Sequence, residues 1–152
     1  RHLSLGFEAP KSLLHRNQAR LTGHPSDCHP TKDCRGQLMS DCLFCQIIAG
    51  KIQANIVHKD DHAVAFTDVN PKAPLHLLII PRRHTETLND LVSADDTTMG
   101  HIIRLATKLA AENGYDESGY RLVLNCNRDA GQSVFHIHLH LLAGRTLTWP
   151  PG

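Results

Sequence analysis

Apolar residues fall into a regular pattern only from Asp41 onward, where two helical periods stand out. The first is short, and the residues that share its apolar face are Leu43, Phe44, Ile47 and Ile48. Gly50 stands where a left-handed residue would end such a helix. The second period starts after Ser93 as the expected N-cap, ends at Gly114, and has the apolar positions Ile102, Ile103, Ala106, Leu109 and Ala110. The pattern therefore predicts one short and one long helix.

Apolar runs of strand length predict the sheet of the domain. Four of them cover residues 56–58, 63–66, 76–80 and 120–125, with a polar turn at 59–61 between the first two. A fifth run, within residues 131–142, alternates strictly. Because most of these runs are joined by turns, neighbouring strands are expected to pair as hairpins. The sequence thus predicts an α+β fold, a five-stranded antiparallel sheet with one long and one short helix.

The alternating run carries the most distinctive chemistry of the chain. On a strand, His136, His138 and His140 would line one face and the apolar residues between them the other. Three imidazoles in a row pack poorly, since each ring nitrogen withdrawn from water needs a hydrogen-bond partner or a ligand. A half-exposed strand that carries histidines by chance is the simplest interpretation. The two functional interpretations are a metal site and a nucleophile with supporting histidines.

A short polar turn, Gly131-Gln132-Ser133, precedes the histidines and is able to direct backbone N–H groups and a hydroxyl at an anion. The pattern His-x-His-x-His with apolar x, followed by two apolar residues, resembles the signature of the histidine triad (HIT) family. Further stretches are similar, in order, to its branch of nucleotide-binding nucleoside phosphoramidases: Ala73-Pro74-Leu75-His76, Ile80-Pro81-Arg82-Arg83-His84 and Trp149-Pro150-Pro151-Gly152. The resemblance covers about residues 41–152 and implies a HIT-like fold.

Length and charge narrow the possible partners. The 152 residues suffice for one domain, expected at 39–152, and residues 1–38 are interpreted as a disordered leader or an artificial extension, with a transit peptide as the alternative. Lys and Arg total 16 against 15 for Asp and Glu, so no electrostatic footprint for nucleic acid or an anionic membrane is present. We therefore expect a small-molecule partner and a cytoplasmic location.

The resemblance implies a hydrolase that cleaves the P–N bond of purine nucleoside 5′-phosphoramidates through a nucleotidyl-histidine intermediate. It gives the nucleophilic role to His138, with the backbone carbonyl of His136 fixing its tautomer. Residues implied beside the phosphate and the leaving group are His140, His76 and Ser133, and those implied to hold phosphoryl oxygens are Asn125 and the backbone amides of Gln132 and Ser133. A dinucleoside polyphosphate hydrolase and a nucleotide-binding regulatory protein with incidental catalysis are the alternatives.

The nucleoside part of the substrate is anticipated by the earlier segments. Asp68 follows the second predicted strand, where its carboxylate can accept hydrogen bonds from both ribose hydroxyls. Apolar residues expected to form a slot for the base are Leu43, Phe44, Ile47, Phe66, Val69 and Leu78. Such a slot recognises a flat ring and few polar edges, so a purine is expected and adenine versus guanine stays open.

Cys42 and Cys45 have the two-residue gap of a zinc-binding pair. By resemblance to zinc-containing members of the wider superfamily, His84 and His136 would complete a structural site. Two free thiols are the alternative, and catalysis is expected to need no metal.

The chain ends in an indole followed by two prolines, which cannot continue a strand. The resemblance implies a homodimer in which the long helix and the 120–125 strand meet their symmetry mates and form one sheet of ten strands. Trp149 would then approach the partner's active site and help to select the leaving group. A disordered tail is the alternative.

Overall fold

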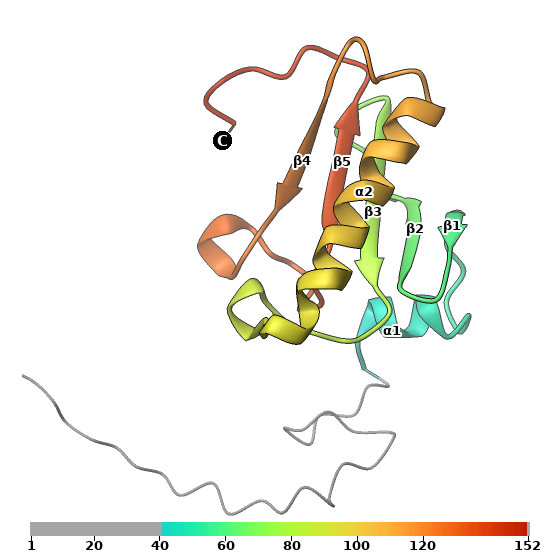
Figure 1. The fold of residues 1–152 in the computed structure, drawn as a ribbon, viewed down its shortest axis with the longest axis vertical. Helices are drawn as coiled ribbons and strands as arrows, with labels where there is room; N and C mark the ends of the chain where they lie inside the picture. Colours follow the sequence, from blue (N-terminus) through green and yellow to red (C-terminus); the bar gives the residue numbers. More distant parts are fainter. Residues whose placement is uncertain (1–40, 152) are drawn as a thin grey trace, which may run out of the picture.

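The computed structural model describes residues 41–151; the predicted leader lies outside the described residues. Its helices and strands are α1 (Leu43–Ile48), β1 (Ile56–Lys59), β2 (Ala63–Thr67), β3 (Leu75–Pro81), α2 (Asp96–Glu112), β4 (Tyr120–Leu124) and β5 (Leu139–Ala143). The strands form one sheet in the order β1-β2-β3-β5-β4, and every neighbouring pair is antiparallel (Figure 1). The predicted α+β architecture is confirmed.

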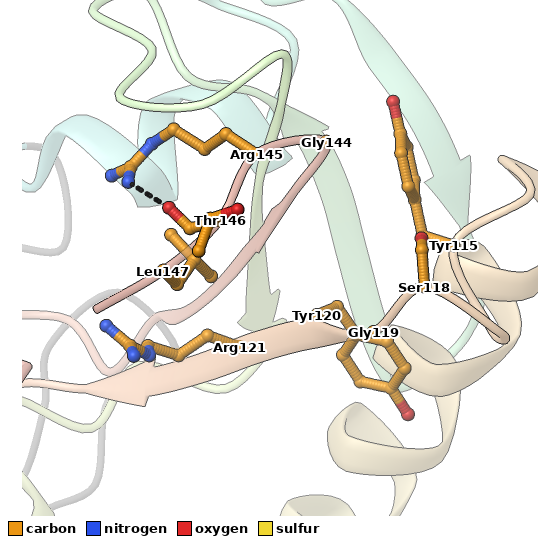
Figure 2. A pocket seen from close by; sticks show the side chains of 9 residues that line it. All are labelled: Tyr115, Ser118, Gly119, Tyr120, Arg121, Gly144, Arg145, Thr146 and Leu147. Carbon is orange, nitrogen blue, oxygen red and sulfur yellow. Dashed lines mark hydrogen bonds between the residues drawn. The ribbon is translucent and has the colours of Figure 1, made fainter. Parts of the chain in front are cut away.

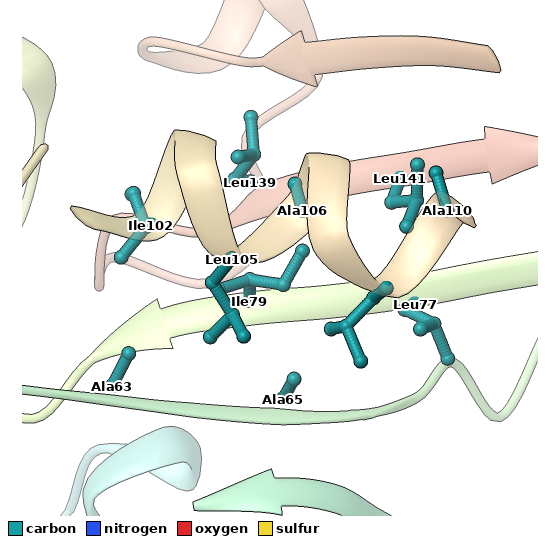
Figure 3. Packing of buried hydrophobic residues seen from close by; sticks show 11 residues of the cluster. Ala63, Ala65, Leu77, Ile79, Ile102, Leu105, Ala106, Ala110, Leu139 and Leu141 are labelled. Carbon is teal, nitrogen blue, oxygen red and sulfur yellow. The ribbon is translucent and has the colours of Figure 1, made fainter. Parts of the chain in front are cut away.

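The long helix α2 covers one face of this sheet (Figure 1). Alternate residues of β2, β3 and β5 point toward it, since successive strand side chains face opposite ways. The buried cluster that they form with α2 is drawn in Figure 3 and consists of Ala63, Ala65, Leu77, Ile79, Ile102, Leu105, Ala106, Leu109, Ala110, Leu139 and Leu141. The helix thereby fixes which face of the sheet remains for chemistry.

The opposite face of the sheet carries α1 and a second, smaller apolar cluster: Phe44, Ile47, Val64, Phe66, Leu78 and Ile80. His140 belongs to this face, because its cross-strand partners are Leu78 on β3 and Val123 on β4. His76 shares the face, two residues before Leu78 on β3. We call this side of the sheet, which bears α1, the α1 face.

The prediction that all three triad histidines lie on one strand is wrong. Strand β5 begins only at Leu139, so that His136 and His138 come before it and His140 alone lies within it. The reason is that the backbone N–H of Ile137 donates to Thr85 O, 2.8 Å away in the loop after β3, instead of joining the ladder. The alternation does hold inside β5, where Leu139 and Leu141 face α2.

The start of the long helix also differs from the prediction. Ser93 opens a 3-10 turn, Ser93–Asp95, and α2 starts at Asp96. Buried Asp95 accepts the backbone N–H of Val92 at 3.0 Å and pairs with Arg83, which holds this turn. Ile103, which the helical spacing placed with the apolar face, is 44% exposed. Across residues 41–151, no helix is long and apolar enough to cross a membrane.

Candidate active site

His138 occupies the position expected of a nucleophile. Its Nδ1 lies 2.8 Å from the backbone oxygen of His136, and since a carbonyl only accepts, Nδ1 carries the proton and Nε2 keeps a free lone pair. Phe44 packs edge-on against the ring at 5.2 Å. Burial lowers the pKa of His138, opposed by the bond to the His136 carbonyl, so the neutral ring predominates at pH 7.

The tautomers of His76 and His140 follow from the same reasoning. The Lys72 backbone N–H donates to His76 Nδ1 at 3.1 Å, so the proton of neutral His76 is on Nε2, which lies 2.9 Å from His140 Nδ1. His140 must then carry its own proton on Nε2. That atom is buried and has no hydrogen-bond partner among residues 41–151. An unpaired buried donor beside the His138 ring is suited to an anionic ligand.

The electrostatics of this pair keep both rings neutral. Burial, with the nearby His138 and His76 rings, lowers the pKa of His140 to about 4. Burial likewise lowers the pKa of His76, opposed by the charge of Asp68. The carboxylate Oδ2 of Asp68 lies 3.4 Å from His76 Nε2, while Oδ1 accepts the Asn70 backbone N–H at 2.8 Å. The carboxylate expected to bind the ribose therefore lies beside His76 of the histidine pair.

Asp68 also lines a cavity of about 720 Å³ between α1 and the β1–β2 edge of the sheet. Of the slot predicted for the base, Ile47 and Val69 line this cavity. Phe44, Phe66 and Leu78 are instead buried in the apolar cluster of the α1 face, and Leu43 is 44% exposed. Sequence analysis missed the remaining lining residues, which are Gly50, Ile52, Gln53, Ala54, Asn55, Ile56 and Thr67. Most of these lie in the irregular stretch between α1 and β1, which has no apolar period to draw attention to it.

The loop between β4 and β5 gives Gln132 a different role from the expected one. Its backbone N–H, predicted to hold phosphate, donates to Asn127 O at 3.0 Å. Its buried side chain accepts from the Asn127 backbone N–H at 2.8 Å and donates to Glu86 O and Val134 O at 2.7 and 3.2 Å. Asn127 has φ 66° and ψ −177°, a conformation nearly restricted to glycine, so Gln132 stabilises a strained turn.

The other two residues expected at the phosphate are placed without a fixed partner. The side chains of Asn125 and Ser133 make no hydrogen bond to any other residue from 41 to 151, and Ser133 is exposed. Both flank the turn that Gln132 and Asn127 hold together. They thus remain available to a ligand.

The four predicted metal ligands meet at the end of α1. Cys45 Sγ lies 3.3 Å from His84 Nδ1 and 3.6 Å from His136 Nδ1, and Cys42 Sγ lies 3.6 Å from His136 Nδ1. Tetrahedral zinc, with its usual bond lengths to sulfur and nitrogen, separates such atoms by about 3.5 Å. All four ligand atoms lie within 4.8 Å of one another. The donor set therefore fits zinc.

The protonation states at this site also suit a cation. His136 Nε2 lies 2.8 Å from Pro81 O, to which it must donate, and this leaves the lone pair of Nδ1 directed to the cysteines. Burial disfavours thiolates here, but when His136 Nδ1 is also protonated, hydrogen bonds from His136 and His84 and the charge of His136 lower the pKa of Cys42 to about 5. Burial and that neighbouring thiolate raise the pKa of Cys45 to about 12. A divalent ion would supply the charge needed to ionise both.

This arrangement of histidines has counterparts among known proteins. Residues 49–147 match the HIT domain family. A purine nucleoside phosphoramidase from Escherichia coli K12 is 44% identical over 110 residues, which are 72% of this chain and 92% of that protein. The chain belongs to the HIT family. It is thus a hydrolase of the HIT type.

Solved HIT structures agree with this assignment. A HIT family hydrolase from Legionella pneumophila superposes with a TM-score of 0.73 at 52% identity, covering 74% of this chain and all of that one. A zinc-bound HIT family protein from Mycobacterium smegmatis gives a TM-score of 0.62 at 31% identity, over 70% of this chain and 76% of that one. The fold and family are therefore supported by sequence and by shape.

The C-terminal tail of the HIT domain is connected to His76 through Lys72. Arg145 Nε donates to Lys72 O at 2.9 Å, and the N–H of the same Lys72 bonds His76. Arg121 on β4 donates to Thr148 O at 2.7 Å. Figure 2 shows these side chains at a cavity of about 630 Å³ between β4 and the tail. Beyond it, Trp149 is 84% exposed.

Proposed function

We propose that this chain hydrolyses the P–N bond of purine nucleoside 5′-phosphoramidates through a nucleotidyl intermediate on His138. The observation that carries the proposal is the tautomer of His138: Nδ1–H is bonded to the His136 carbonyl, and the Nε2 lone pair is free. Neutral histidine is a competent nucleophile for phosphorus, and its phosphorylated form is reactive enough to be hydrolysed. The E. coli relative named purine nucleoside phosphoramidase supports the substrate class.

The reaction proceeds in two displacements. In the first, His138 Nε2 bonds to phosphorus while the P–N bond breaks, and the departing nitrogen takes up a proton from solvent. In the second, a water oxygen bonds to phosphorus, the bond from phosphorus to Nε2 breaks, and the proton of the water returns to solvent. One water is consumed, and one amine and one nucleoside monophosphate are formed. The exposed hydroxyl of Ser133 is assigned to relay these protons on the leaving-group side.

His140 acts as a hydrogen-bond donor and not as the acid. A further proton fits neither ring of the pair, since His76 Nδ1 accepts from Lys72 and the space between the rings already holds one proton. The Nε2–H of His140 is then the group that stabilises charge on a phosphoryl oxygen, where a buried donor acts more strongly than in water. Asn125 is assigned to a second phosphoryl oxygen.

The 720 Å³ cavity is assigned to the nucleoside. Its end at Asp68 is the ribose end, because that carboxylate also reaches His76 beside the phosphate. The apolar residues Ile47, Ile52 and Val69 would contact the base. Purified protein should therefore release AMP from an AMP-amine phosphoramidate faster than from a diadenosine polyphosphate, measured side by side.

A rapid-quench experiment tests the intermediate directly. Mass spectrometry of quenched protein should find AMP bound to the peptide that contains His138, and His138→Ala should lose both the adduct and turnover while AMP still binds. Turnover of the polyphosphate alone would contradict the substrate assignment. Full activity of His138→Ala would contradict the mechanism.

We also propose that Cys42, Cys45, His84 and His136 hold a structural zinc ion. The spacing and tautomers described above support this, as does the zinc-bound M. smegmatis relative. When bound, zinc would cross-link α1, the loop after β3 and the segment before β5. Elemental analysis should find close to one zinc per chain, and metal-free protein of unchanged stability would contradict the proposal.

A homodimer through α2 and β4 is the proposed assembly. Strand β4 is an edge of the sheet and partly exposed along its whole length. On α2, Ile103 is an exposed apolar side chain, which an isologous contact would cover. The tail with Trp149 would then reach the partner's leaving-group site.

A further inference from the structure

We propose that His136 is a positioning residue that couples the metal centre to the nucleophile. Ligation of its Nδ1 fixes the backbone carbonyl that holds the tautomer and orientation of His138. The inference rests on the zinc site and on the nucleophile of the proposed function. It assigns to the metal a kinetic role in addition to a structural one.

His136 has one functional contact on its ring and another on its backbone. It is fully buried, with Nδ1 3.6 Å from both cysteine sulfurs and Nε2 bonded to Pro81 O. Its carbonyl oxygen lies 2.8 Å from His138 Nδ1. No other described residue belongs to both the metal cluster and the hydrogen bonds of the nucleophile.

The sheet does not fix this carbonyl. β5 and its ladder begin at Leu139, with Leu139 paired to Ile79 and to Leu124. Ahead of that, the backbone N–H of Ile137 has its bond to Thr85 O in a loop. Among the described residues, the peptide unit that follows His136 is therefore held by that bond, by the ring of His136 and by the bond to His138 Nδ1 itself. Metal ligation would immobilise the ring through two cysteines and His84, whereas without it the bond to Pro81 O and the 3.6 Å contacts with the two cysteine sulfurs remain.

The helix α1 provides a second connection between the two centres. Phe44 lies between the two cysteines in sequence, and its ring is edge-on to both His136 and His138, at 5.9 and 5.2 Å. The helix has six residues and no side-chain N-cap bond, so it depends on tertiary anchors. Ligation through Cys42 and Cys45 anchors the helix that carries Phe44.

Position 136 allows a matched pair of variants. In His136→Asp, Oδ1 takes the place of Nδ1 and is a good zinc ligand, whereas in His136→Asn the same atom belongs to a poorly ligating amide. Both variants lose the bond to Pro81 O equally and have nearly the same volume. Cys126→Ser, at a cysteine outside the metal cluster, serves as the control for thiol effects.

Three measurements are made on full-length protein, with wild type both zinc-loaded and zinc-depleted: zinc content, the nitrogen-15 NMR signals of the His138 ring at one fixed pH where it is neutral, and kcat against nucleotide Kd. Wild type, Cys126→Ser and His136→Asp should hold zinc and show His138 protonated at Nδ1 alone. His136→Asn, and wild type depleted of zinc, should show a mixture of tautomers and a kcat lower by about 10- to 100-fold with Kd little changed.

A single Nδ1–H tautomer in zinc-depleted, folded wild type or in folded His136→Asn would overturn the inference, and so would failure of wild type to bind zinc. If zinc-depleted wild type does not stay folded, the comparison of Asp with Asn decides the question. Because the tautomer is read without substrate, a protein that turns over no phosphoramidate would refute the proposed function and leave this test valid.

Discussion

Replacing Gln132 by Ala should destabilise the fold through the loop between β4 and β5. The side chain is 6% exposed and makes three hydrogen bonds, two to the carbonyls of Glu86 and Val134 and one to the backbone N–H of Asn127. Each such bond contributes about 0.5 to 1.5 kcal/mol, and buried groups left unpaired add to the cost. Because Asn127 is exposed and can turn to water, we expect a loss of about 2 to 3 kcal/mol.

The effect on catalysis should be indirect. Without the Gln132 side chain, the bond from the Asn127 backbone N–H is lost and the backbone bond to Asn127 O remains, so Asn127 can relax from its strained conformation and the turn that presents Asn125 and Ser133 loosens. The value of kcat should fall while nucleotide affinity changes little, since the cavity assigned to the nucleoside lies at the β1–β2 edge of the sheet and the Gln132 loop joins β4 to β5 at the other edge.

Urea unfolding of wild type, Gln132→Ala and Gln132→Glu measures the change in the free energy of unfolding. The midpoint should shift down with an unchanged m-value. Gln132→Glu keeps an acceptor for Asn127 but sets a carboxylate against two carbonyls, so it should be at least as unstable. Exposed Ser133→Ala is the matched control and should lie within about 0.5 kcal/mol of wild type. Unchanged stability with a raised KM in Gln132→Ala would refute this reasoning and return Gln132 to the substrate.

Four further predictions concern the histidines and the tail. His138→Ala should lower turnover by several orders of magnitude with AMP affinity kept, by titration calorimetry; near-wild-type turnover would refute the nucleophile. Because the pKa of His138 is lowered, the acid limb of kcat/KM should have its midpoint below pH 6.5, and a midpoint near 7 would contradict a buried neutral ring. Since His140 binds its proton less readily folded than unfolded, stability should be complete above pH 6.5 and fall toward pH 4, by about 1 to 2 kcal/mol after solvent screening, in urea melts. Light scattering should find a dimer, and deleting residues 149–152 should change amine preference more than AMP affinity; a fully active monomer or an unchanged profile would refute these two expectations.

The spacing of apolar residues and the positions of turn residues in the sequence determined the helices and strands of this domain. The 3.6-residue spacing after Asp41 and the alternation in the strands predicted both helices and all five strands, and Gly50 does end α1 with φ 73°. The turn at 59–61 was also predicted from its residue types. Asp60 accepts hydrogen bonds from the backbone N–H groups of His62 and Ala63 and so closes this turn. These features depend on neighbours a few residues away, so the sequence contains their cause.

Features set by long-range contacts were beyond such reasoning. The late start of β5 depends on Thr85, more than fifty residues away, accepting the N–H of Ile137. The role of Gln132 depends on Glu86 and on the strain at Asn127. The cavity lined by Asp68 depends on an aperiodic stretch, Gln53 to Ile56, that lines it together with Thr67 and Asp68.

The sequence by itself determined the chemistry available to this protein: which residues can attack, donate and ligate. Only the tertiary structure decided which contacts and which tautomer each histidine has. His136 is directed to the cysteines, His138 has a free Nε2, and His140 has a buried Nε2–H. The physical reason is that the protonated nitrogen of a neutral imidazole is set by its hydrogen-bond partners. Here these are carbonyls and amides at Pro81, His136 and Lys72, and only folding brings the first and last of them to the rings.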